Sequence, residues 1–122
     1  MPNIIYLAIA AISGATMALQ GTLNSVLGKV VGLIESTLIV HIIGTISILL
    51  VFILMGKGLS NVSKLGEVPW YAYLGGVLNV IIILTIVKTM PVIGVGNATT
   101  AIIVAQVGTA VLIDSLGLFG MK

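Results

Sequence analysis

The sequence predicts an all-α integral membrane protein with four transmembrane helices. Of its 122 residues, 59% are hydrophobic and 7% are charged, and the mean hydropathy is +1.32. A soluble domain carries about 25% charged residues, far more than the five lysines and three acids of this chain can supply. The charges also divide the sequence into four apolar stretches, each near the roughly 20 residues of one bilayer crossing. This composition excludes a soluble enzyme, a nucleic-acid-binding protein and a disordered tail.

The first two spans are bounded by charged or glycine residues. The first covers residues 4–28 and ends before Lys29, and its start and length differ from those of a cleaved signal peptide. The second covers residues 36–55, after Glu35 and before Gly56-Lys57-Gly58. Because backbone polar groups in hydrocarbon must pair within their own segment, we expect these spans, and the two that follow, to be helical.

The last two spans each begin at a proline. The third covers residues 69–87 and the fourth covers residues 91–113. Proline is compatible with the first turn of a helix, so we expect Pro69 and Pro91 at helix starts. The third span opens with an aromatic cluster typical of a membrane interface, namely Trp70, Tyr71 and Tyr73. Together the four spans form a single transmembrane domain over residues 1–122.

The lysines do not fix the orientation of the chain in the bilayer. With four spans, both termini share one side with the loop between the second and third spans. That side carries Lys57, Lys64 and Lys122, and the other side carries Lys29 and Lys88. Positive-inside reasoning needs a clear excess. Either other features set the topology, or the chain inserts both ways and pairs with itself as an antiparallel (inverted-topology) dimer, a recurring ground plan of transporters.

The first and fourth spans carry stripes of small residues at steps of four and three, which keeps each stripe on one helical face. The stripes are Gly14, Ala18, Gly21, Ser25 and Gly28 in the first span, and Gly94, Ala98, Ala101, Ala105 and Gly108 in the fourth. Small residues let membrane helices approach closely, so we predict that these faces form the packing core; chance in a Gly/Ala-rich chain is the alternative. The bulkier second and third spans suit a lipid-facing position.

The same two spans concentrate polar side chains. These are Ser13, Gln20 and Asn24 in the first span, and Asn97 and Gln106 in the fourth, with Thr99 and Thr100 nearby. Amides in hydrocarbon are costly unless they face protein or water. Two interpretations stay open: hydrogen bonds between helices at about 0.6 kcal/mol each, or a polar passage that binds a small-molecule substrate between the first and fourth helices.

Three titratable residues are candidates for coupling transport to an ion. His41 lies in the second span, Glu35 opens that span and Asp114 closes the fourth. Each also has a structural interpretation: a hydrogen-bonded histidine, an acid favoured by the helix dipole at a helix start, and a solvated interfacial charge. The chain has no cysteine, and its one histidine and three acids are scattered, so we predict no metal site, no cofactor and no enzyme activity.

Four segments in order resemble the DUF606 (YdcZ-type) family of bacterial inner-membrane proteins. They are Leu19-Gln20-x-x-Leu23-Asn24-x-x-Leu27-Gly28, Trp70 with Tyr73-Leu74-Gly75-Gly76, Met90-Pro91-x-x-Gly94 followed by Ala105-Gln106, and Ile113-Asp114-x-x-Gly117-x-Phe119-Gly120. Two residues depart from the family pattern. His41 stands where the family has Ser or Asn, and Asn79 stands where it has Gly. The family pattern also continues into a fifth span that the sequence up to Lys122 does not contain.

The resemblance implies a multi-pass exporter of the bacterial inner (plasma) membrane, within the drug/metabolite transporter superfamily and related to small multidrug resistance proteins. It also implies an antiparallel dimer, formed with a second copy or with a paralogous chain. The small multidrug proteins couple to protons through a glutamate in the middle of the first helix, which this sequence lacks. Either amides bind a neutral or polar substrate, or His41, Asp114 or Glu35 performs the coupling.

We therefore expect a transporter of a small molecule, working as a dual-topology dimer, without a nucleic-acid partner. One alternative is a small dual-topology ion channel of the fluoride type, which uses an arginine and a ladder of phenylalanines; this chain has no arginine and two phenylalanines. Another alternative is a non-transporting membrane assembly subunit, in which the amides only hold helices together.

Overall fold

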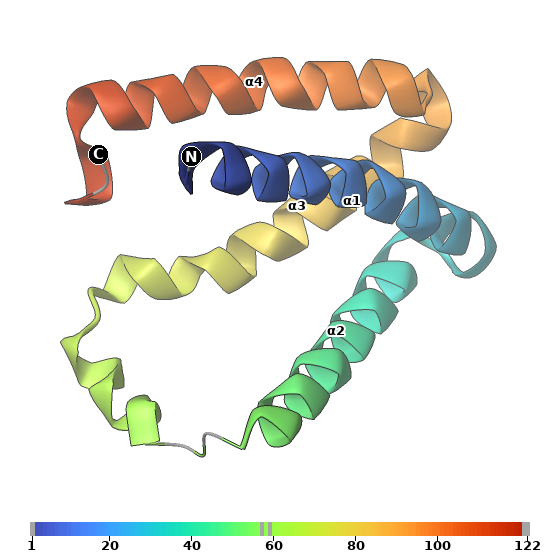
Figure 1. Ribbon diagram of the computed structural model, residues 1–122. Coiled ribbons are helices and arrows are strands. Elements are labelled where there is room, and N and C mark those ends of the chain that lie inside the picture. Colours follow the sequence, from blue (N-terminus) through green and yellow to red (C-terminus); the bar gives the residue numbers. More distant parts are fainter. Residues whose placement is uncertain (1, 57, 59, 121–122) are drawn as a thin grey trace.

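The computed structural model describes residues 2–56, 58 and 60–120, and it is all-helical over them (Figure 1). The elements are α1 (Pro2–Val31), α2 (Leu33–Met55), η1 (Ser60–Glu67), η2 (Trp70–Leu74), α3 (Gly75–Ile93), α4 (Val95–Leu116) and η3 (Leu118–Gly120). Four stretches are long and apolar enough to cross a membrane: α1, α2, η2 with α3, and α4. The prediction of four candidate transmembrane helices is confirmed. Lys57 and Lys122, which entered the orientation argument, lie outside the described residues.

The boundary between the third and fourth spans differs from the prediction. Helix α3 continues past Lys88 to Ile93, and Pro91 lies inside its last turn, so the expectation that Pro91 begins a helix is wrong. The helix breaks instead at Gly94, whose φ of 92° is accessible to glycine because glycine has no Cβ. Pro69 does precede a helix, as the residue that caps η2.

The two halves of the chain are built on the same junction. Gly32 alone joins α1 to α2 with φ 106° and ψ 161°, and Gly94 alone joins α3 to α4 with φ 92° and ψ 155°. In each junction the glycine N–H donates to the carbonyl four residues earlier, and its carbonyl accepts from the N–H four residues later, at 2.9–3.0 Å. Such dihedral angles are essentially restricted to glycine. The second half thus repeats the first at an offset of 62 residues, and both junctions lie opposite the chain ends (Figure 1).

The core lies where α3 passes behind α1, near the two junctions (Figure 1). The buried apolar side chains are Ile83, Val87, Met90 and Ala98, and the buried polar ones are Asn24, Ser25, Ser36 and Thr37. Across the 62-residue offset, Ser25 corresponds to Val87 and Ser36 corresponds to Ala98. The third span does not simply face lipid as expected, because α3 supplies three of the four buried apolar side chains.

The small-residue stripe of α1 packs against α3. A Cβ added to Gly21 would lie 2.8 Å from Met90 Cε, and one added to Gly28 would lie 2.5 Å from Val87 Cγ1. The missing side chains therefore allow the two helices to approach closely. Of the α4 stripe, Ala98 is buried, whereas Ala101, Ala105 and Gly108 are exposed in the single chain.

The single chain is open rather than compact. Its accessible surface is 9,487 Å², whereas a compact soluble protein of 12.6 kDa exposes about 6,200 Å². Helices α2 and α4 have no Cα atoms within 8 Å of each other, although both contact α1 and α3. Extensive apolar faces are thus left for lipid or for another protein chain.

Candidate substrate cavity

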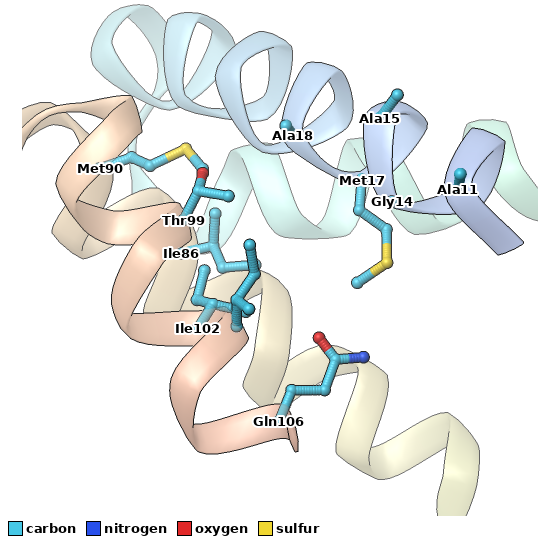
Figure 2. A pocket seen from close by; sticks show the side chains of 11 residues that line it. Ala11, Gly14, Ala15, Met17, Ala18, Ile86, Met90, Thr99, Ile102 and Gln106 are labelled. Carbon is cyan, nitrogen blue, oxygen red and sulfur yellow. The ribbon is translucent and has the colours of Figure 1, made fainter. Parts of the chain in front are cut away.

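A cavity of about 200 Å³ lies between α1, α3 and α4 (Figure 2). Eleven residues line it: Ala11, Gly14, Ala15, Met17 and Ala18 of α1, Ile86 and Met90 of α3, and Thr99, Ile102, Ile103 and Gln106 of α4. Apart from Met17, the α1 residues that line the cavity are small, and their side chains leave this space unfilled. None of the lining residues is charged.

Thr99 and Gln106 provide the hydrogen-bonding groups of the cavity. Among the described residues, Thr99 Oγ1 is a buried side-chain oxygen without a hydrogen-bond partner. The neighbouring Thr100 differs, because its hydroxyl donates to the Gly96 carbonyl of its own helix at 2.8 Å. Figure 2 shows the Gln106 amide and the Met17 thioether pointing toward one another. The cavity therefore suits an uncharged, largely apolar molecule that can hydrogen-bond to a hydroxyl and an amide.

The five predicted substrate-binding residues are placed differently. Gln106 lines the cavity. Asn24 is buried with 8% of its surface exposed, and Ser13 and Gln20 are exposed on α1. Asn97 is exposed as well, and its Nδ2–H donates at 3.0 Å to the carbonyl of Ile93, the last residue of α3. Of this set the structure brings only Gln106 to the cavity.

Two further lining residues had a signal in the sequence. Thr99 shares a helical face with Gln106, and Met17 lies on the same face of the first span as Ser13 and Gln20. The sequence does not show which helix packs against each of these faces. Helix α1 turns its small-residue stripe toward α3 and α4, which leaves part of its polar face exposed.

A second groove of about 280 Å³ lies between α2 and α3. It is lined by Ile34, Thr37, Leu38, His41, Val80 and Leu84. At the 62-residue offset, Thr37 corresponds to Thr99 and His41 corresponds to Ile103, both of which line the first cavity. The two grooves are therefore counterparts in the two halves of the chain.

The predicted coupling residues do not form a cluster. His41 is half-buried and hydrogen-bonds with Asn79 of α3 and with the Thr37 carbonyl. Glu35 is exposed in the first turn of α2, and Asp114 is exposed near the end of α4. Within the described part of the chain, no three His, Cys, Asp or Glu residues come together as metal ligands.

Four helices long and apolar enough to cross a membrane, three of which line an uncharged cavity, are typical of a small multi-pass membrane protein. The model of the family DMT_YdcZ, described as "Putative inner membrane exporter, YdcZ", matches residues 5–122, and the chain belongs to this family. It is therefore an inner-membrane protein, and the family is one of exporters rather than of enzymes. No curated protein and no solved structure matches the chain.

Proposed function

We propose that this chain exports a small, uncharged organic molecule across the inner membrane and binds it in the cavity between α1, α3 and α4. The observation that carries the proposal is that the Thr99 hydroxyl, which has no hydrogen-bond partner, and the Gln106 amide both line an otherwise apolar, uncharged cavity. A buried hydroxyl without a partner is costly, and a ligand that hydrogen-bonds to it removes that cost. Membership in an exporter family supports the direction of transport.

Helix α4 is the element suited to open and close the cavity. Its only buried residue is Ala98, in the first turn after the Gly94 junction. The rest of α4 touches α1 and α3 less extensively than α1 and α3 touch each other. An element with few packed contacts moves at low cost, and a glycine junction is a natural hinge. Rotation of α4 about Gly94 would move Thr99 and Gln106 away from α1 and release the bound molecule.

A second, inverted copy of the chain completes the site in this proposal. The cavity of about 200 Å³ is smaller than the roughly 300–1,000 Å³ of pockets for drug-sized ligands. Ala101, Ala105 and Gly108 form a small-residue face that is exposed in the single chain, and such faces are typical of helix–helix contacts. The second copy would pack there, and Ser13, Gln20 and Asn97, which are exposed in the single chain, would line the shared interior.

The export proposal can be tested before the substrate is identified. Untargeted mass spectrometry would compare small molecules in the medium of cells expressing the wild type, Thr99→Val, Gln106→Leu or no protein. Thr100→Val is the matched control, because that hydroxyl bonds within its own helix and does not line the cavity. We expect at least one compound to accumulate with the wild type and Thr100→Val, and to fall several-fold with the two cavity variants.

Three results would contradict the proposal. If all variants export as well as the wild type does, the cavity is not the binding site. If the wild type reaches the membrane and changes nothing in the medium, the assembly-subunit alternative is favoured. Fluoride efflux from liposomes containing the purified protein would instead favour the channel alternative.

A further inference from the structure

The cavity between α1, α3 and α4 has two polar ends and an apolar middle. Thr99 lies five residues after Gly94 and Gln106 lies twelve after it, which separates the two by about 10.5 Å along α4. Ile102 of α4 lies between them in the sequence, and Ile86 of α3 lines the same space. A molecule that hydrogen-bonds to both ends therefore needs a polar group at each of its own ends and an apolar body between them.

A methionine thioether accompanies each polar end. Met90 of α3 lies four residues before Gly94, at the end of the cavity where Thr99 lies (Figure 2). Met17 of α1 points toward the Gln106 amide at the other end (Figure 2). Among the described residues, those lining the cavity include no aromatic side chain. Methionine sulfur makes favourable contacts with aromatic rings, often at the ring edge, and the flexible side chain adjusts to the ring. The two thioethers therefore favour an aromatic ligand.

The Thr99 hydroxyl is available to a ligand because it does not bond within its own helix. Its counterpart at the 62-residue offset, Thr37, donates to the Leu33 carbonyl at 2.9 Å, and the neighbouring Thr100 donates to the Gly96 carbonyl. Thr99 Oγ1 is buried and has no such partner in the described part of the chain. The hydroxyl therefore needs an acceptor, which a ligand oxygen supplies and a lipid hydrocarbon chain does not.

The volume of the cavity limits the size of the apolar body. The cavity measures about 200 Å³, and an apolar protein cavity of about 150 Å³ binds benzene. The space therefore suits one six-membered ring with a small substituent at each end. A rigid ring also loses less conformational freedom on binding than a flexible chain of the same length does. Because no lining residue is charged, a charged substituent would be buried without a counter-ion.

We propose that the exported molecule is a neutral compound with a single aromatic ring and a hydrogen-bonding group at each of two opposite ring positions. Thr99 donates to an oxygen at one end, the Gln106 amide hydrogen-bonds to the other end, and Met17 and Met90 contact the ring. The export of this class of compound rests on the proposed function. The binding of the class in the cavity does not, and it can be measured without transport.

The methionine methyl groups can report on a bound ring, because an aromatic ring shifts the NMR signals of nearby methyl groups. The probe is 4-(hydroxymethyl)benzamide, added to ¹³C-methyl-methionine-labelled protein in lipid nanodiscs. We expect the signals of Met17 and Met90 to shift and to saturate with probe concentration. Met55, which is exposed at the end of α2 and lines no described cavity, should show no saturable shift. Single Met→Leu variants assign the signals, because this exchange conserves volume.

Variants of the two polar ends test the hydrogen bonds. Thr99→Val and Gln106→Leu should each weaken probe binding by about three- to tenfold, which corresponds to the loss of one hydrogen bond. Thr100→Val should bind the probe as the wild type does, because that hydroxyl bonds within its own helix. Partition of the probe into lipid is the same for every variant and cancels in the comparison. para-Xylene, which has the ring without polar groups, should bind Thr99→Val at least as well as the wild type.

Two relatives of the probe test the ring and the charge. The saturated 4-(hydroxymethyl)cyclohexanecarboxamide and the charged 4-(hydroxymethyl)benzoate should each displace the probe several-fold less well than unlabelled probe does. Equal displacement by the saturated compound, no saturable shift at Met17 and Met90, or unchanged affinity in Thr99→Val would overturn the proposal. If the probe binds as expected but the wild type exports nothing, the proposed function fails while the binding class stands. If cells export a compound of another class and the probe does not bind, the class fails while the proposed function stands.

Discussion

Replacing Gly28 by alanine tests the close contact between α1 and α3 on which the rest of the structure depends. The added Cβ would lie 2.5 Å from Val87 Cγ1, about 0.9 Å short of the 3.4 Å at which ordinary contact begins. Val87 is only 6% exposed, and a β-branched side chain on a helix has one strongly preferred rotamer, so it cannot rotate away. Overpacking of this kind typically costs about 1–3 kcal/mol, which is the loss of stability we expect.

Gly21→Ala is the matched comparison for this prediction. Its Cβ would meet Met90 Cε at 2.8 Å, but this atom is the end of a flexible side chain that can shift, so the loss should be smaller. Val87→Ala removes the clashing methyl groups, so adding it to Gly28→Ala should give a favourable coupling energy of about 1 kcal/mol.

The assay is reversible unfolding in mixed detergent–SDS micelles, followed by circular dichroism, for the four variants and the wild type. The free energy of unfolding then gives both the single effects and the coupling energy. If Gly28→Ala costs no more than Gly21→Ala, and its effect simply adds to that of Val87→Ala, the described packing of α1 on α3 is wrong.

Three further predictions concern the junctions, the α4 stripe and the orientation of the chain. Gly94→Ala should destabilise by about 1–3 kcal/mol in the same assay, because φ is 92° although an added Cβ meets no atom within 4 Å; Gly96→Ala, with the same space inside α4, should be neutral or stabilising. Gly108→Leu should weaken self-association measured by energy transfer in liposomes, whereas Gly44→Leu should not; equal effects would contradict the proposed contact. A reporter fused after Lys122 should be found on both sides of the membrane, and a single orientation would contradict an inverted dimer of one chain.

The sequence predicts the helices well because bilayer length and charge placement limit the alternatives. The boundary between the third and fourth spans is predicted at the wrong place, because Lys88 is interpreted as the end of one helix and Pro91 as the start of the next. Lys88 lies little more than a turn before the end of α3, where a long side chain can reach the membrane interface. Gly94 sets the real break, and its positive φ is a property of the folded backbone that the sequence only permits.

The site is less predictable because it depends on which helices meet. Periodicity identifies the face shared by Thr99 and Gln106, but not that α1 presents Gly14 rather than Gln20 to them. The pairing of His41 with Asn79 requires the register between α2 and α3, which no local pattern encodes.

The most direct test of the central claim is to fill the cavity. Gly14 lines it, and an added Cβ there meets no atom within 4 Å, so Gly14→Leu should place its side chain in the substrate space without disturbing the backbone. Gly44→Leu on α2 has equal room and lines no described cavity. The measurement is the initial efflux rate, from proteoliposomes, of the compound identified in the medium. We predict that Gly14→Leu abolishes efflux and that Gly44→Leu retains the wild-type rate. Wild-type efflux by a correctly inserted Gly14→Leu protein would contradict the assignment of this cavity as the transport site.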